Sequence, residues 1–99
     1  MALKTDRNEV DRTELPDGQQ TDYLVLSDLE RSKGFVRPLR AQYRHLTCNA
    51  EISMPEKIAE TYAADPGFYG KTFCVHCMGH FPVGAGGEFV WLDGSKVGT

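Results

Sequence analysis

The sequence predicts an α+β fold, with a small antiparallel sheet and one helix. Three observations favour this class. One amphipathic segment near the middle of the chain has helical spacing, strand-like runs lie on both sides of it, and short Cys/His clusters at 45–48 and 74–77 flank it. With 99 residues the chain buries a modest core, and domains of this size often need an additional stabilising cross-link such as a bound metal.

Residues 1–20 are polar, carry the turn signal Pro16-Asp17-Gly18 and show no hydrophobic periodicity. We expect them to form a flexible acidic N-terminal arm, because such a segment has little apolar surface to bury. Residues 21–99 are then expected to form a single domain.

The first elements expected in this domain are a strand and a short helical turn. Residues 23–26 are an apolar run of strand type. Ser27 and Asp28 are suited to cap a helical turn that extends through Ser32, and Gly34 interrupts that turn.

Apolar and polar residues alternate over residues 39–45, which predicts a half-buried strand. The alternation points His45 toward the core and the arginines toward solvent. The inward face carries Leu39, Ala41, Tyr43 and His45, and the outward face carries Arg40, Gln42 and Arg44.

A helix is predicted from Ser53 to Ala64. Ser53 and Glu56 have the spacing of a capping box, in which each side chain accepts a hydrogen bond from an exposed amide of the first turn. Met54, Ile58 and Tyr62 then recur at intervals of four, as on one face of a helix. Residues 65–67, Asp-Pro-Gly, end the helix.

The C-terminal third predicts three more strands. Residues 72–74 enter a tight turn, residues 82–87 form a glycine-rich loop, and residues 88–92 and 96–97 form a hairpin around Asp93-Gly94.

The two Cys/His clusters predict a metal site. His45 and Cys48 stand three positions apart, 25 residues separate them from Cys74, and Cys77 follows three positions later. Each pair spans one tight turn, and Asn49 and Gly79 are residues that help the main chain fold back in such turns. One histidine and three cysteines are a typical donor set for structural Zn²⁺.

Alternatives to this ligand set remain at this stage. His80 replaces His45 as the fourth ligand if the second cluster uses the spacing Cys-x-x-Cys-x-x-His. A site completed between two chains, or plain core thiols, also fits the spacing. A redox dithiol is disfavoured because Gly79 and Pro82 prevent the helix that normally follows such a motif.

A site with four protein ligands leaves no open position for a substrate, so the metal is expected to be structural and the protein not to be an enzyme. The sequence therefore predicts a zinc-ribbon-like, zinc-binding domain over residues 21–99. No nucleophile–base pair or phosphate-binding loop is recognisable, and no small-molecule substrate is expected.

The charge distribution suggests a binding partner. The net charge is −3, yet residues 31–44 contain five basic and no acidic residues. Arg37, Arg40 and Arg44 are expected on the outer face of the strand that leads into the metal site, where they would contact phosphates. The primary hypothesis is thus a nucleic-acid-binding module.

The longest motifs, GFVRPLRAQYRHLTC, AETYAADPGFYGKTFCVHC and GHFPVGAGGEFVWLDGSKVGT, resemble a group of small uncharacterised proteins encoded in bacteriophage and prophage genomes. The resemblance covers residues 23–99. In that group a glycine commonly follows the first cysteine, where this chain has Asn49. The resemblance implies a phage or prophage origin and no established activity.

An alternative function follows from this resemblance: a phage accessory protein that binds and modulates a host protein or defence system without catalysis. The expected location is the cytoplasm of a bacterial host, where thiols stay reduced. The N-terminal residues lack the apolar core of a signal peptide, and no apolar run has the length of a membrane span.

Overall fold

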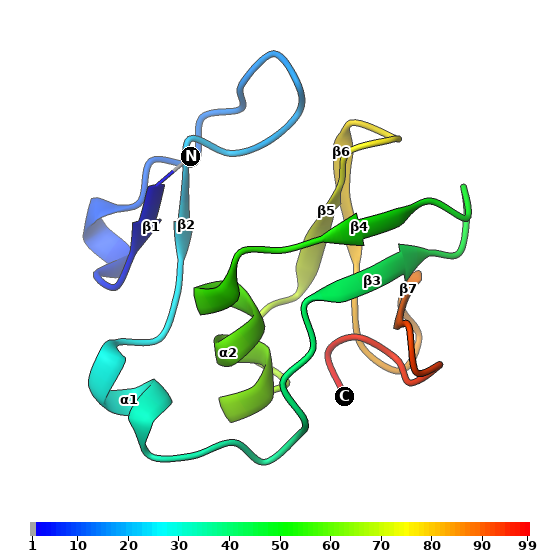
Figure 1. Ribbon diagram of the computed structural model, residues 1–99. Helices are drawn as coiled ribbons and strands as arrows, with labels where there is room; N and C mark the ends of the chain where they lie inside the picture. Colours follow the sequence, from blue (N-terminus) through cyan, green and yellow to red (C-terminus); the bar gives the residue numbers. More distant parts are fainter. Residues whose placement is uncertain (1) are drawn as a thin grey trace.

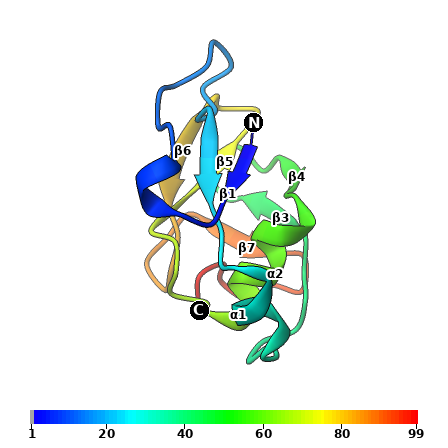
Figure 2. The same cartoon turned by 90° about the vertical axis from the view of Figure 1, so that its left-hand side faces the viewer.

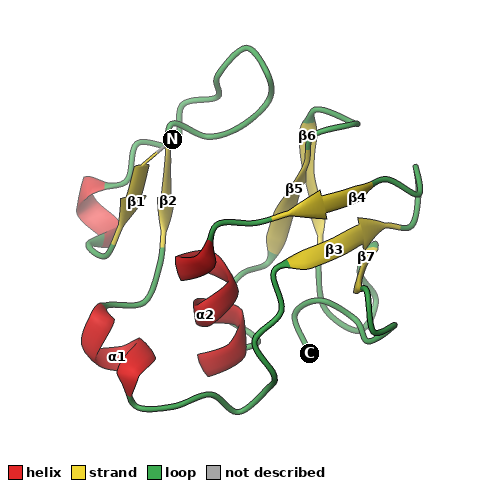
Figure 3. Cartoon of the chain, in the orientation of Figure 1, coloured by secondary structure: helices red, strands yellow, loops and turns green. Residues whose placement is uncertain are grey.

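The computed structural model describes residues 2–99 and places seven short strands around one main helix (Figure 1, Figure 3). The predicted α+β class is confirmed. The helices are α1 (Asp28–Ser32) and α2 (Glu56–Ala64), with a 3₁₀ turn at Arg7–Glu9. The strands are β1 (Ala2–Lys4), β2 (Asp22–Leu24), β3 (Gln42–His45), β4 (Glu51–Ser53), β5 (Lys71–Cys74), β6 (Gly79–Pro82) and β7 (Phe89–Trp91).

The central sheet has the order β4-β3-β7 and is antiparallel throughout. Tyr43, in the middle of β3, lies opposite Ile52 on one side and Trp91 on the other. The hairpin β5-β6 forms a second antiparallel sheet. The Tyr43 hydroxyl donates to the Phe73 carbonyl oxygen at 2.6 Å and so links the central sheet to β5.

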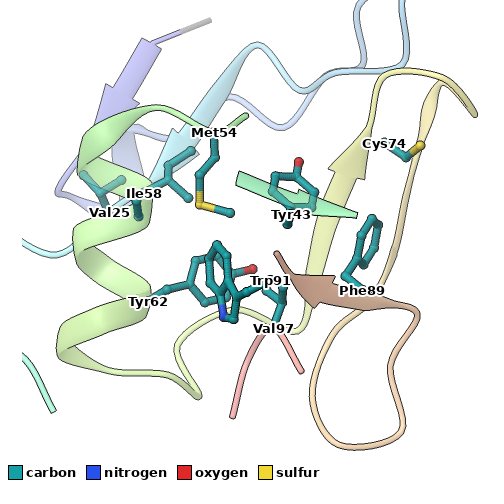
Figure 4. Close-up of a cluster of buried hydrophobic side chains, with 10 residues drawn as sticks. Val25, Tyr43, Met54, Ile58, Tyr62, Cys74, Phe89, Trp91 and Val97 are labelled. Atoms are coloured by element: carbon teal, nitrogen blue, oxygen red, sulfur yellow. The ribbon is translucent and has the colours of Figure 1, made fainter. Parts of the chain in front are cut away.

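The core lies between α2 and the central sheet. In Figure 4 the side chains of Met54, Tyr62 and Trp91 cluster beside the helix, while Phe89 and Cys74 lie at the end toward β5. Trp91 meets the rings of Tyr62 and Tyr43 edge to face, with centroids 5.5 and 6.3 Å apart. Aromatic rings thus supply much of the burial that a small core requires.

The helix begins later than the sequence predicts. Ser53 belongs to β4, opposite Gln42, and the Met54 amide donates to the Ala41 carbonyl, so the sheet continues through the expected capping box. The cap residue is Pro55, and no side chain accepts from the first turn. The prediction of a capping box at Ser53 was therefore wrong, because strand pairing with β3 outweighed the local signal. The end of the helix at Ala64 is as predicted.

The predicted N-terminal arm contains regular structure. β1 pairs in parallel with β2, and the Thr13 carbonyl accepts hydrogen bonds from the main chain and the hydroxyl of Thr21. Figure 2 looks onto this pair of strands, with α1 and α2 below them. The flexibility of the arm stays a prediction. Within residues 2–99, no helix combines the length and apolarity that crossing a membrane requires.

Several smaller expectations need adjustment. Ser27 caps α1 as predicted, its hydroxyl oxygen accepting from the Glu30 amide at 3.2 Å. Leu39 was expected in the core but precedes β3 and is 48% exposed. The expected strand at 96–97 is reduced to a single bridge between Lys96 and Val90.

Candidate metal centre

The side chains of His45, Cys48, Cys74 and Cys77 converge, with one donor atom from each lying within 4.8 Å of all the others. The Sγ of Cys48 lies 3.4 Å from His45 Nδ1 and 3.6 Å from Cys74 Sγ, and Cys77 Sγ lies 3.5 Å from the same nitrogen. In a tetrahedral zinc site, bonds of about 2.3 Å to sulfur and about 2.0 Å to nitrogen separate the ligand atoms by about 3.5–3.8 Å. These three distances therefore match those between the ligands of a tetrahedral metal centre.

Two tight turns bring these donors together, and they share one feature. The residue directly after the second ligand of each pair is left-handed: Asn49 has φ 62° and Met78 has φ 56°. In the first turn the Asn49 amide donates to the His45 carbonyl at 2.6 Å, and in the second the Cys77 amide lies 3.4 Å from Cys74 Sγ. The sequence pointed to Gly79 for the second turn, but Gly79 is already the first residue of β6.

His45 is held in place by aromatic rings. Its side chain is 0% exposed and lies between Phe89, at a centroid distance of 4.5 Å and nearly parallel, and Phe81, at 4.7 Å. β3 supplies the orientation, because the alternation along that strand points Tyr43 and His45 to the same buried side. The predicted inward orientation of His45 is thus confirmed.

A carboxylate fixes the orientation of the imidazole. His45 Nε2 lies 2.9 Å from Glu88 Oε1, which also accepts from the Thr47 hydroxyl at 2.8 Å. These two hydrogen bonds, that of His45 first, lower the pKa of Glu88 and keep it ionised. Because an ionised carboxylate can only accept a hydrogen bond, Nε2 donates to Glu88, and Nδ1 faces the sulfurs of Cys48 and Cys77. Such carboxylate–histidine pairs are a common support of zinc ligands.

Sequence reasoning missed Glu88 and Thr47. Glu88 reaches the imidazole because β7 pairs with β3 in a register that sets His45 opposite Phe89. No local motif encodes that register.

The thiols of Cys48 and Cys77 have different pKa values because their surroundings differ. Desolvation raises the pKa of Cys48, but hydrogen bonds from the Ala50 amide and from neighbouring side chains outweigh it and bring the value to about 7. Desolvation and the adjacent sulfurs raise the pKa of Cys77 to about 12. The thiol of Cys77 thus resists ionisation beside its neighbouring sulfurs, and a divalent cation among them would favour its thiolate.

The other histidines lie outside the cluster. His80 Nε2 is 2.7 Å from the Tyr23 hydroxyl, and its ring contacts Tyr23 and Phe73. Among residues 2–99, the cluster that gathers enough donors for a metal does not include His80 or His76. The structure therefore brings together the first of the two predicted ligand sets.

The three arginines predicted to bind nucleic acid already form ion pairs or hydrogen bonds within the chain. Arg40 Nη1 lies 3.1 Å from Asp93, its guanidinium stacks on Trp91 at 4.9 Å, and its side chain is 18% exposed. Arg44 pairs with Glu51 at 2.7 Å. Arg37 is exposed and donates to the main-chain oxygens of Val36 and Thr99. The three side chains do not form one free basic surface.

The contact with Glu88 gives a first testable prediction. We expect Glu88→Gln to weaken zinc binding about 10- to 100-fold, because the amide no longer stabilises the proton on Nε2 as a carboxylate does. Competition with a chromophoric chelator measures this affinity. Glu51→Gln is the matched control, because Glu51 pairs with Arg44 and does not contact the cluster. Equal affinities for the Glu88 variant and the unmodified protein would contradict the role assigned to this carboxylate.

The candidate metal centre consists of four converging donors, two tight turns of matching backbone geometry and one supporting carboxylate. Comparison of the chain with protein-family models, with curated proteins and with solved structures finds no match.

Proposed function

We propose that this chain is a small, non-catalytic binding module, held in its fold by one structural zinc ion, that acts by binding another protein. The observation that carries the zinc assignment is the convergence of His45, Cys48, Cys74 and Cys77, whose donor atoms all lie within 4.8 Å of one another. Thiolate and imidazole donors in this number favour Zn²⁺ over the oxygen-preferring cations Mg²⁺ and Ca²⁺.

A structural role follows from the completeness of the ligand set. Four protein donors fill a tetrahedron, so no position remains for a water molecule or a substrate. The metal would connect the turn after β3 to the turn after β5, two elements of different sheets. An ion in this place stabilises the arrangement of the sheets and performs no chemistry.

A protein target is favoured over a nucleic acid by the state of the arginines. Arg40 and Arg44 already have acidic partners within the chain, so their charges are partly neutralised where a phosphate would have to approach. The chain is also acidic overall, with a net charge of −3. Together with the resemblance of its motifs to phage and prophage proteins, this supports an accessory role on a host protein in a bacterial cytoplasm.

Native mass spectrometry of protein purified without chelator tests the zinc assignment. We expect one zinc ion per chain and its loss together with the folded charge-state distribution when the solution is acidified, because protons compete for the thiolates. A folded chain that carries no metal would overturn the assignment.

Nucleic-acid binding through Arg37, Arg40 and Arg44 is the second candidate, favoured by the exposure of Arg37, whose hydrogen bonds go to main-chain oxygens. If the protein-binding proposal holds, zinc-loaded protein produces no anisotropy change with labelled duplex or single-stranded DNA or RNA at low salt. A salt-sensitive change that Arg37→Glu or Arg44→Glu abolishes, and Lys33→Glu preserves, would instead establish the nucleic-acid function. Lys33 is a suitable control because it lies at the end of α1, away from the strand that carries Arg44, and is paired with Glu30.

A further inference from the structure

A groove of about 520 Å³ lies between β4 and β5, outside the metal centre. Its walls are residues 51–55 on one side and 71–73 on the other, and Tyr43, Ile58 and Tyr62 form its floor. Its volume falls in the range of ligand sites in proteins, roughly 300–1,000 Å³. We call it the β4–β5 groove.

Both walls are strand edges without a partner. Among residues 2–99, β4 pairs with β3 alone and β5 pairs with β6 alone. Tyr43 and Ile52 form a pair in the ladder between β3 and β4. On one side of this pair His45 N–H donates to the Ala50 carbonyl, and on the other Met54 N–H donates to the Ala41 carbonyl. Since hydrogen-bonded pairs alternate along an antiparallel ladder, the amides and carbonyls of Glu51 and Ser53 face away from β3.

The same alternation holds for β5. The Val83 amide donates to the Gly70 carbonyl, so Thr72 bonds to β6 while the main-chain groups of Lys71 and Phe73 face the groove. The Phe73 carbonyl is occupied by the Tyr43 hydroxyl. The edge of β4 therefore offers the more complete set of free groups: two amides and two carbonyls.

A buried hydroxyl on the floor also lacks a partner. Tyr62 is 3% exposed, and its hydroxyl makes no hydrogen bond within residues 2–99. Burial raises the pKa of Tyr62, and the Thr72 side chain offsets part of that rise. Leaving such a group unsatisfied costs about 1–3 kcal/mol. The hydroxyl lies beneath the surface of the floor, with less than 1 Å² accessible, so the floor presents the aromatic ring of Tyr62 to a ligand.

One end of the groove is cationic. Tyr23, Tyr69 and Lys71 also line an adjoining cavity of about 310 Å³, which Arg7 and Arg12 border. Arg7, Arg12 and Lys71 form no ion pair with an acidic side chain within the described part of the chain. Burial lowers the pKa of the neighbouring His80, on which Glu14 and Lys71 act in opposite directions. Asp17 acts on Tyr23, which lines both cavities, so Glu14 and Asp17 offset part of this positive charge.

We propose that the β4–β5 groove binds an extended, apolar segment of a partner protein, which pairs with the free edge of β4 and places a carboxylate near Arg7, Arg12 and Lys71. The unpaired edge supplies main-chain hydrogen bonds, the aromatic floor receives alternate side chains, and the cationic end selects an acidic residue or a C-terminus. This inference rests on the proposed protein-binding function and names the surface and the class of ligand.

The test is selection of a displayed library of random ten-residue peptides on zinc-loaded protein, followed by affinity measurement of the enriched peptides as synthetic probes. We expect peptides with alternating apolar residues and an acidic residue near one end. Ser53→Pro should weaken their binding at least about tenfold, because proline removes an outward amide while the ladder to β3 keeps its bonds.

The charge at the end of the groove is tested in parallel. Lys71→Glu should weaken the binding of acidic peptides at least about tenfold, since it reverses a charge beside the bound carboxylate. Lys57→Glu is the matched control: Lys57 is exposed on α2 and lines neither cavity, so affinity should change less than about twofold. Zinc stoichiometry of each variant verifies that it is folded.

Two results would overturn the inference: no peptide enriched on folded, zinc-loaded protein, or enriched peptides whose affinity neither Ser53→Pro nor Lys71→Glu changes. A zinc-loaded protein that binds peptides at another face would refute the groove and leave the proposed function standing. A chain that folds without zinc, or that binds nucleic acid through its arginines, would instead refute the proposed function.

Discussion

Cys74→Ser is expected to unfold the protein. Cys74 is 0% exposed, lies at the end of β5 and joins the two halves of the metal centre, its sulfur standing 3.6 Å from that of Cys48. A serine hydroxyl is a poor zinc ligand, so the ion is lost together with most of its binding energy. For structural zinc sites that energy is of the order of 10–16 kcal/mol, which matches or exceeds the whole stability of a small domain at about 5–15 kcal/mol.

The measurement is the dispersion of the amide NMR spectrum, with circular dichroism and zinc stoichiometry on the same sample. We expect a collapsed spectrum for the variant and the same spectrum for unmodified protein treated with a strong chelator. A well-dispersed, stable spectrum for Cys74→Ser would refute the claim that zinc binding and folding are one process.

Val97→Ala is the matched control for loss of core packing. Val97 is 0% exposed and belongs to the same hydrophobic cluster as Cys74, but it offers no metal donor. We expect it to lower the free energy of unfolding by about 1–3 kcal/mol while the protein keeps one zinc ion. The contrast separates removal of buried volume from removal of a ligand.

The sequence alone was enough to predict the parts of the structure that depend on local spacing. The three-residue intervals of His45–Cys48 and Cys74–Cys77 placed two donors on each of two turns, and the alternation before His45 pointed its side chain inward. Both features follow from the geometry of a few consecutive residues. For the same reason α2, with its period of four, was recognised although its first turn was misplaced.

The parts that escaped prediction depend on pairing between distant segments. β4 and β6 have three and four residues, too few for a period of two to appear, and each exists through its partner strand. Glu88 supports His45 because of the register between β7 and β3. The β4–β5 groove arises where two separate sheets face each other. Each feature is non-local and has no signature within its own segment.

The second large effect is expected at His45, in comparison with His80. His45→Phe should reduce zinc affinity by more than the roughly 100-fold that loss of a supporting group costs, because it removes one of the four donors outright. Phenylalanine keeps an aromatic ring between Phe81 and Phe89, so the variant removes coordination while leaving the stacked packing in place. Chelator competition and thermal unfolding with and without added zinc measure the two effects.

His80→Ala is the counterpart, because His80 was the competing fourth ligand and is engaged instead by the Tyr23 hydroxyl at 2.7 Å. We expect this variant to bind one zinc ion with unchanged affinity and to lose about 1 kcal/mol of stability from the broken hydrogen bond. If His80→Ala releases the metal while His45→Phe retains it, the ligand set is Cys48, Cys74, Cys77 and His80. The second turn would then have to rearrange so that the His80 imidazole leaves Tyr23. The burial of His45 between two rings and against Glu88 argues for the opposite result, because every contact of that imidazole leaves Nδ1 facing the sulfurs.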